Sequence, residues 1–452
     1  MEKREETLAR NSQRLKGNGE GRAAVRLRLL LRALRHRNFQ LFFGGQLISL
    51  IGTWMQNVAL AWLVYRLTGS PLLLGTVGFA GQIPVFILAP AGGLLADRYN
   101  RRRIVIATQA SALVLALVLA GLTLAGSVRV WHIILLASLL GAVNAFDIPA
   151  RQAFIVQMVG REDLMNAIAL NSSMFNGARV VGPAVAGLVV AAVGEGWCFL
   201  ANGVSYIAVI VALLAMKGGR RAPAESDERR AVDHIAEGFR YVWHTTPVRA
   251  LLLLLGLVSV VGTPYTVLMP IFAGQILHGG ARGLGLLMGA TGVGALLGAL
   301  TLAMRSGLRG LGRMAAAASA GFGASLILFS SSRRFWLSAA LLVPVGYSLM
   351  LQMAASNTLI QSMVPDRLRG RVMSLYSMMF MGMAPLGALF AGTVAGVLGA
   401  PRTVAIGGVV CLVGSALFAW RLPALRPEVR QLIIAQGMAG GEPPEELTIR
   451  SV

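Results

Sequence analysis

The chain has 452 residues, of which 56% are hydrophobic and only 13% are charged. Soluble domains usually carry about 25% charged residues, so this composition excludes an ordinary soluble enzyme, a disordered protein and a secreted disulfide scaffold. The 41 Lys and Arg residues outnumber the 19 Asp and Glu residues, which gives a net charge of +22. In a soluble protein that excess would indicate nucleic-acid binding. Here its meaning depends on where the basic residues lie.

Charge-free windows long enough to cross a bilayer recur along the chain. A membrane helix needs about 20 apolar residues, and backbone groups in lipid must be paired within their own segment. The windows therefore predict an all-α integral membrane protein with twelve transmembrane helices. They run over 38–65, 67–96, 104–128, 130–146 (extended to about Arg151), 164–194 (interrupted by Arg179), 196–216, 250–281, 283–304, 314–332, 335–365, 372–401 and 403–420.

The basic residues are distributed unequally between the two sides of this predicted membrane. If the N-terminus is cytoplasmic, 34 of the 41 Lys and Arg residues lie in cytoplasmic segments and only 6 on the other side. This is a strong positive-inside pattern. It predicts a multi-pass membrane protein with both termini cytoplasmic and with no nucleic-acid partner. The polar first 38 residues predict no cleavable signal peptide.

The long polar segment 217–249 divides the predicted spans into two groups of six. We therefore expect a basic segment 1–37, a bundle 38–216, a linker 217–249, a bundle 250–420 and a tail 421–452. Within the linker, helical spacing predicts an amphipathic helix on the membrane surface rather than a solvated loop. Its apolar positions are Val232, Ile235, Ala236, Phe239, Val242 and Trp243. Residues 24–37 show a similar pattern ahead of the first span.

The two halves repeat each other at an offset of 205 residues. The matched pairs are Met158 with Met363, Val159 with Val364, Phe175 with Phe380, Gly177 with Gly382, Gly182 with Gly387 and Gly187 with Gly392. A shift of six spans predicts parallel repeats around an axis normal to the membrane, which is the arrangement of the major facilitator fold. The alternative is chance, because Gly and Met are common in membrane helices.

The loop between the second and third spans carries the most specific motif. It reads Gly93-Leu94-Leu95-Ala96-Asp97-Arg98-Tyr99-Asn100-Arg101-Arg102-Arg103. This resembles the signature loop of the major facilitator superfamily, with Asn100 where that pattern usually has Gly. We expect Asn100 to tolerate a left-handed backbone, Gly93 to let two helices approach, and Asp97 to cap a helix or pair with an arginine in a gate that includes Arg98, Arg101 and Arg102. The alternative is a basic loop that anchors to lipid headgroups.

Other stretches extend the resemblance over residues 35–420. Gly182-Pro183 followed by Gly187 is similar to the exporter motif of the superfamily, although small residues that simply pack two helices are the alternative. The segments 37–42, 144–154 and 364–374 resemble a branch that contains bacterial enterobactin exporters and macrolide efflux proteins. This resemblance implies a location in the bacterial inner membrane and two six-helix bundles that rock around a substrate site. It also implies export of drug-like or siderophore-like molecules and coupling to protons.

Polar residues inside the predicted spans are candidates for the substrate and coupling pathway. Arg179 is the deepest charge, and we expect it to face a central cavity and bind an anionic group or to pair with an acid such as Asp147. A structural ion pair is its alternative. The other candidates are Gln56, Asn57, Gln82, Asn144, Asp147, Arg151, Gln352 and Asn357. Each of the amides could instead form a hydrogen bond between helices.

No catalytic, metal-binding or phosphate-binding motif is visible, so we expect no enzyme activity and no cofactor. The partners that we expect are a small-molecule substrate, the proton and the lipid bilayer, and we expect the chain to act as a monomer. The leading hypothesis is a proton-coupled exporter of small amphipathic molecules. The alternatives are a metabolite importer or lipid flippase on the same fold, and a polytopic membrane enzyme or scaffold. No acid lies near the middle of a predicted span, so proton coupling is implied by the resemblance alone.

Overall fold

A computed structural model describes residues 32–160, 162–217, 237–305 and 307–440 of the chain. Within this part, twelve helices are long and apolar enough to cross a membrane, which confirms the predicted number. The first six are α3 (Arg37–Thr68), α4 (Pro71–Arg98), α5 (Arg101–Leu124), α6 (Val130–Val159), α7 (Leu164–Val193) and α8 (Glu195–Ala215), preceded by the short 3-10 helix η1 (Arg32–Arg35).

The second six spans include two that contain π-helical segments. The seventh consists of α10 (Thr246–Leu257), η2 (Val258–Gly262), α11 (Tyr265–Ile271) and η3 (Phe272–Ile276). The eleventh consists of α15 (Asp366–Ser377), η4 (Met378–Gly382) and α16 (Ala384–Leu398). The remaining four are α12 (Gly280–Ala303), α13 (Leu311–Ser331), α14 (Phe335–Met363) and α17 (Ala400–Gly440).

Two helices extend furthest beyond the charge-free windows from which the spans were predicted. Helix α6 continues past Asp147 and Arg151 to Val159, because these two side chains form an ion pair that compensates both charges. Helix α17 continues to Gly440 with Pro423 and Pro427 inside it, whereas we expected the last span to end at 420. Of the predicted linker helix, residues 237–244 are helical and leave Phe239 and Trp243 exposed. Val232, Ile235, Ala236 and most of 24–37 lie outside the described residues.

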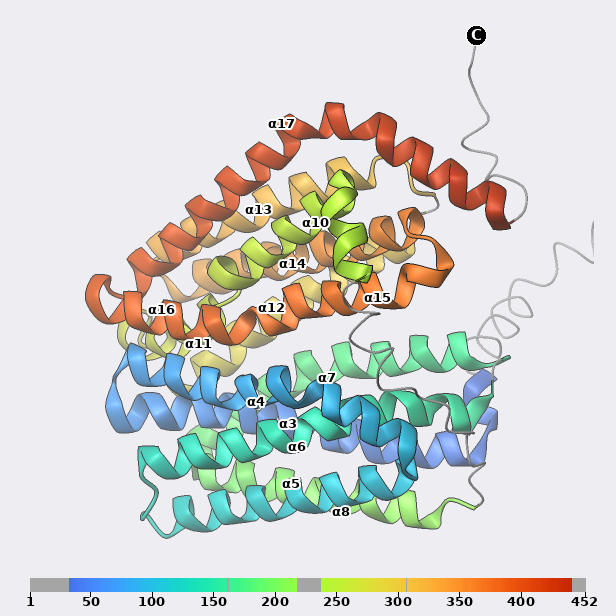
Figure 1. Cartoon of the computed structure of the whole chain (residues 1–452). Helices are drawn as coiled ribbons and strands as arrows, with labels where there is room; N and C mark the ends of the chain where they lie inside the picture. The colour runs from blue at the N-terminus through green and yellow to red at the C-terminus, as the bar shows by residue number, and fades with distance from the viewer. Residues whose placement is uncertain (1–31, 161, 218–236, 306, 441–452) are drawn as a thin grey trace, which may run out of the picture.

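The two halves form two groups of helices, with the first six spans below and the last six above in Figure 1. The described chain begins and finishes on the same side, which we call the termini end. The connections after α3, α5 and α7 lie on the other side, which we call the opposite end. Helix α4 packs against α16, and α7 packs against α12, so each half contributes two helices to the interface between the halves.

The apolar core shows that the halves are joined mainly near the opposite end. One cluster of buried residues combines both halves, with Leu63 and Leu74 from the first and Leu268 and Leu284 from the second. At the termini end the core is divided. A cluster around Phe39 contains only first-half residues, and a cluster around Leu255 contains only second-half residues. The molecule is therefore closed at the opposite end, while its halves have separate cores at the termini end.

Candidate functional site

Two pairs of glycines close the opposite end, and the 205-residue offset relates Gly187 of one pair to Gly392 of the other. A Cβ atom added to Gly75 of α4 would lie 2.5 Å from the Ala388 carbonyl oxygen and 2.9 Å from the Gly392 Cα of α16. A Cβ atom added to Gly285 of α12 would lie 2.5 Å from the Pro183 carbonyl oxygen and 2.9 Å from the Gly187 Cα of α7. Ordinary side chains would not fit at these crossings, because the contacts are with backbone atoms. Glycine therefore permits both crossings.

The predicted exporter motif lies at one of these crossings. Gly187 meets Gly285 of α12, and Gly182 of the same helix lies against the Trp54 Cβ and the Ile51 carbonyl of α3. Pro183 lies within α7, which stays helical from Leu164 to Val193. The three motif residues thus let α7 approach α3 in its own half and α12 in the other half.

One face of α4 runs along the whole interface between the halves. Gly75, Gly78, Gln82, Phe86 and Gly93 share this face at helical spacing. Near the opposite end Gly75 meets α16, and Phe86 lies against Gly382 at the centre. Gln82 is exposed between them. Gly93 has no neighbour around its Cβ position, so in this conformation our expectation of a close approach there is wrong.

The close approach that we expected at Gly93 occurs one residue earlier. Gly92 lies against the Ala145 carbonyl of α6, so it fixes α4 within its own half. Gly93 instead lies on the face that points toward the second half. Adjacent residues of a helix point about 100° apart, so Gly92 and Gly93 face different neighbours. The sequence does not show which of these two directions faces α6.

The signature loop is held to its own half by arginines. The Arg101 guanidinium donates to the carbonyls of Ala96 (3.0 Å) and Ala153 (3.4 Å) and lies 3.5 Å from the Asp97 carboxylate. Arg102 donates to the Leu214 carbonyl (3.1 Å) at the end of α8. Asp97 stays 54% exposed and Arg98 is exposed as well. The expected pairing of Asp97 with an arginine is therefore present but weak.

Asn100 caps the following helix, and its backbone does not use the left-handed conformation that Asn tolerates. Its φ of −67° and ψ of 109° are extended, and its side-chain oxygen accepts a hydrogen bond from the Arg103 amide (3.2 Å). Asn is a preferred N-cap residue. The replacement of the usual Gly therefore gives α5 a defined beginning.

Arg179 lies where both halves meet, at the middle of the molecule. Its guanidinium carbon lies 5.8 Å from the centre of the Trp54 ring, and its own carbonyl lies 3.1 Å from the Cβ position of Gly292 on α12. Its side chain is half-buried. The alternative that Arg179 pairs with Asp147 is wrong, because Asp147 is occupied elsewhere.

Asp147 belongs to a buried polar network inside the first half. Its carboxylate accepts hydrogen bonds from Thr108 (2.8 Å) and Gln109 (3.0 Å) of α5 and lies 3.1 Å from Arg151. Arg151 also donates to the Gln46 side chain of α3 (3.2 Å). Only 3% of the Asp147 side chain is exposed, compared with 25% for Arg151. The network joins the helices α3, α5 and α6.

The remaining predicted pathway amides divide between the interface and the interiors of the two halves. Gln56 is buried and accepts a hydrogen bond from Asn202 of α8 (2.8 Å), whereas the adjacent Asn57 is exposed on the Trp54 side of α3. Asn144 is half-buried. Asn357, also half-buried, pairs with Gln361 one turn later. The structure therefore places Asn57 and Gln82 on accessible surface and Gln56 within a bundle.

Gln352 does not line the pathway, because it is fully buried within the second half. The 205-residue offset that defines the repeat relates Gln352 to Asp147 and Ser356 to Arg151. Gln352 and Ser356 have no hydrogen-bond partner among the described residues, nor does the buried Ser319 on the adjacent α13. The charged network of the first half thus has a neutral counterpart in the second half. The residues at these related positions differ in type, so identity between the halves does not reveal the relation.

Sequence analysis missed several residues that complete the site. Trp54 lies beside Arg179, and Phe175 packs against Trp54. Thr108, Gln109 and Gln46 hold the Asp147 network. Aromatic and hydroxyl side chains are common in membrane helices, so no sequence signal distinguished these from packing residues. Their roles depend on which neighbouring helix they face.

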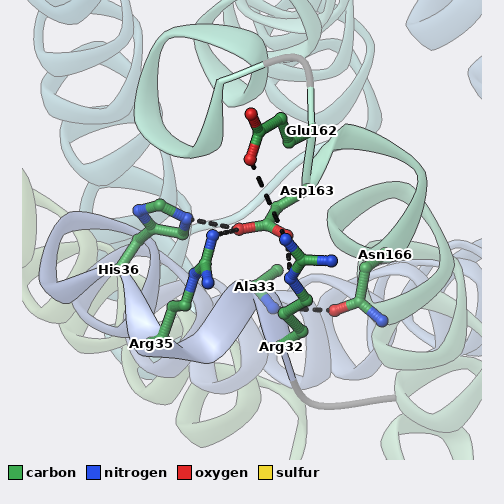
Figure 2. Close-up of polar contacts among 7 residues, drawn as sticks. All are labelled: Arg32, Ala33, Arg35, His36, Glu162, Asp163 and Asn166. Carbon is green, nitrogen blue, oxygen red and sulfur yellow. Dashed lines mark hydrogen bonds and ion pairs between the residues drawn. The ribbon is translucent and has the colours of Figure 1, made fainter. Parts of the chain in front are cut away.

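Outside the spans, a cluster at the termini end docks the segment before α3 (Figure 2). The Asp163 carboxylate, at the beginning of α7, is 1% exposed and lies 2.8 Å from Arg32, 2.8 Å from Arg35 and 2.7 Å from His36. The Ala33 amide donates to the Asn166 side chain (2.8 Å). We call these contacts the Asp163 clamp.

The second half has a similar clamp with the charges reversed. Glu237, in the helix before α10, lies 2.7 Å from Arg367 and also pairs with Arg371, both at the beginning of α15. The Tyr241 hydroxyl donates to the Met363 carbonyl (3.4 Å). In each half, the segment before the first span is therefore fastened to the beginning of the fifth span.

We expect Asp163→Asn to release the segment before α3. The hydrogen bond from His36 contributes most to lowering the Asp163 pKa, and the positive charges of Arg32 and Arg35 lower it further against the opposing effect of burial. Because the folded-state pKa is depressed, the clamp is fully present above the usual Asp pKa of about 3.9. It is lost only as pH falls through the lower folded value.

Hydrogen–deuterium exchange of residues 32–36 at neutral pH measures this release. Exchange should accelerate in Asp163→Asn, while the control Glu162→Gln should resemble the wild type, because Glu162 is 84% exposed and 3.8 Å from Arg32. The difference in thermal stability between wild type and Asp163→Asn should persist from pH 8 to pH 5 and shrink below about pH 4. Equal exchange in all three proteins would contradict the clamp.

Twelve spans in two repeated halves, joined by paired glycine crossings at one end, define the chain as a membrane transporter of the two-bundle type. The model of the family described as transmembrane secretion effector matches residues 30–435. The chain therefore belongs to this family of the major facilitator superfamily, which confirms the resemblance drawn from the signature loop.

Relatives and solved structures agree with this assignment. The chain is 26% identical over 377 residues to the staphyloferrin A transporter of Staphylococcus aureus, covering 82% of this chain and 93% of that protein. It is 29% identical over 367 residues to the multidrug efflux pump Tap of Mycolicibacterium fortuitum, covering 78% and 88%. A bacterial homologue of the iron transporter ferroportin, solved in an inward-facing state, shares the fold with a TM-score of 0.65 and 16% identity, covering 85% and 98%.

Proposed function

We propose that this transporter exports small amphipathic molecules of drug or siderophore type across the bacterial inner membrane by alternating access, coupled to protons. The observation that carries the proposal is the face of α4, whose Gly75 is packed against α16 while Gly93, 18 residues later, is uncovered. Gly75 and Gly93 point in the same direction because 18 residues make about five helical turns. This face of α4 is therefore covered by the second half near the opposite end and uncovered near the termini end.

The charge distribution supports a cytoplasmic termini end. In the described part, the connections at this end carry the signature-loop arginines, Arg305 and the α15 arginines, whereas the opposite end carries few basic residues. By the positive-inside rule this end faces the cytoplasm. In this orientation, the structure is the inward-facing state, closed toward the outside by the glycine crossings.

Rocking of the halves would exchange the open and closed ends. Phe86 of α4 meets the eleventh span at Gly382 of η4. From there toward the termini end, the eleventh span continues as α15. Helix α15 begins with Asp366 and carries Arg367, Arg369 and Arg371. Closure of this end would bring Gly93 and Asp97 toward α15. Asp97 is then placed to pair with these arginines and with the positive N-terminal end of α15. Asp97 would stabilise the outward-facing state.

Export and proton coupling are supported by the names of relatives and by one acid. The Tap relative is a multidrug efflux pump, which favours export over import. Among the acids of the described spans, Asp147 lies furthest from the ends of its span. Its partner Arg151 is partly exposed. We propose that protonation of Asp147 releases Arg151 and weakens the link between α3, α5 and α6.

The test of the gate is Asp97→Asn in proteoliposomes. Loss of the charge should favour the inward-facing state and slow transport by about 10-fold, because conformational coupling energies typically correspond to 5- to 150-fold effects. The protein level and thermal stability should stay near those of the wild type, since Asp97 is exposed. Glu162→Gln is the control, because this acid is also at the termini end, is 84% exposed and lies outside α4 and α15. Equal transport by wild type and Asp97→Asn would remove the gating role.

A further inference from the structure

We infer that the transporter accepts organic anions and that Arg179 receives their carboxylate where α3, α7, α11 and α12 meet. The inference rests on the proposed transport function, because it names the class of molecule that the pathway takes. Arg179 lies 14 residues before Val193, the last residue of α7. At 1.5 Å per residue this is about 21 Å from the opposite end, close to the middle of a bilayer core.

The charge of Arg179 is not compensated by any acid in the part of the chain that the structure describes. Asp147 is paired with Arg151, and Glu195 is paired with Arg66 at the opposite end. A lone cation at this depth is costly and indicates function. The half-buried guanidinium is therefore available to a negatively charged ligand.

Aromatic side chains of the first half form an apolar wall beside this cation. The Arg179 guanidinium carbon lies over the Trp54 ring, 5.8 Å from the ring centre. Phe175, one turn before Arg179, lies edge-on to Trp54 with ring centres 5.7 Å apart, and it is 46% exposed. This arrangement suits a molecule with an acidic head and an apolar or aromatic body.

The second half contributes a hydroxyl donor. Tyr265 begins α11, shortly after the π-helical segment η2. It faces Thr291 of α12, whose neighbour Gly292 meets the Arg179 backbone. The Tyr265 side chain is 2% exposed, and its hydroxyl lies near Thr291 without a partner in hydrogen-bonding geometry among the described residues. A guanidinium and a phenol both donate hydrogen bonds, so together they match the oxygens of a carboxylate.

A lipophilic cation would bind poorly at the same place. It would meet the positive charge of Arg179, and the Trp54 ring that could have accepted it is already occupied by the guanidinium. Because Arg179 and Tyr265 belong to different halves, an anion bound between them would also connect the halves. Its presence would therefore bias the rocking motion that the glycine crossings permit.

Three dansyl probes with the same aromatic body test the inference on purified full-length protein. Dansylglycine carries a carboxylate, dansylamide is neutral and dansylcadaverine carries an amine. Fluorescence titration gives a Kd for each probe. We expect dansylglycine to bind most tightly to the wild type and dansylcadaverine most weakly.

Substitutions then identify the group that recognises the carboxylate. Arg179→Gln should weaken dansylglycine binding by about 10- to 100-fold, the usual range for a hydrogen-bonded charge pair, and change dansylamide binding by less than about 2-fold. Arg179→Lys should restore most of the loss, and Tyr265→Phe should weaken dansylglycine by about 5-fold. Arg282→Gln, an exposed arginine of α12 outside the site, is the matched control.

The outcomes separate this inference from the proposed transport function. Unchanged dansylglycine affinity in Arg179→Gln, or tighter binding of dansylcadaverine, would overturn the anion site even if transport is observed. If the head-group preference depends on Arg179 but proteoliposomes transport none of the probes, the anion site stands and the transport proposal is weakened. Because neutral dansylamide reports whether the site is intact, a misfolded variant is recognised by the loss of all binding.

Discussion

Gly392→Val is expected to prevent the opposite end from closing and to reduce transport by about 10-fold or more. A Cβ atom at Gly392 would lie 2.7 Å from the Pro71 carbonyl and 2.9 Å from the Gly75 Cα, and these backbone atoms cannot move aside alone. Overpacking of this kind costs about 1–3 kcal/mol. Since the alternative conformation avoids the clash, that cost shifts the population toward the state in which the opposite end is open.

Double electron–electron resonance, which measures the distance between two spin labels, detects this shift directly. Spin labels at Leu72 and Leu398, both exposed at the opposite end of α4 and α16, should move apart in Gly392→Val. The native Cys198 and Cys411 are buried and are replaced for this experiment. Gly396→Val is the matched control, because Gly396 lies one turn away on α16 with nothing within 4 Å of its Cβ position. An unchanged distance in Gly392→Val would show that the crossing is not a gate.

The second large effect concerns the buried acid. Asp147→Asn should lower the free energy of unfolding by about 3 kcal/mol, the lower end of the range for breaking a buried ion pair, because Arg151 is partly exposed and retains some hydration. The variant should also transport without responding to a pH gradient. Thermal unfolding and transport with and without a gradient measure the two effects.

The double variant Asp147→Asn with Arg151→Gln separates structure from coupling. Replacing both partners removes the unpaired charge, so stability should return to within about 1 kcal/mol of the wild type. If Asp147 carries the coupling proton, the stable double variant remains insensitive to the gradient. A stable double variant that still responds to the gradient would make the network purely structural.

The sequence predicted the spans well because a bilayer imposes length and polarity on every helix. It also identified Arg179, since a single charge in a long apolar window needs no partner to be recognised. It gave Arg179 the wrong possible partner, because Asp147 has an arginine four residues later on its own helix. Residues four apart on one helix lie on the same face, so Asp147 and Arg151 are held close together by α6 itself.

Side-chain direction was the main feature that the sequence could not supply. Gln56 and Asn57 are adjacent and chemically alike, yet Gln56 bonds Asn202 inside the bundle and Asn57 is exposed. The Asp163 clamp was missed for a related reason, because Asp163 and His36 are 127 residues apart. Only the way α7 packs beside α3 brings them together.

Transport by inside-out proteoliposomes tests the central proposal most directly. Dansylglycine is added outside, where the termini end should be accessible, and a pH gradient with an acidic lumen is imposed. We expect the probe to accumulate in the lumen against its concentration gradient, and we expect a protonophore to abolish this accumulation. Uphill accumulation that survives the protonophore, or net movement out of the lumen under the same gradient, would contradict a proton-coupled exporter.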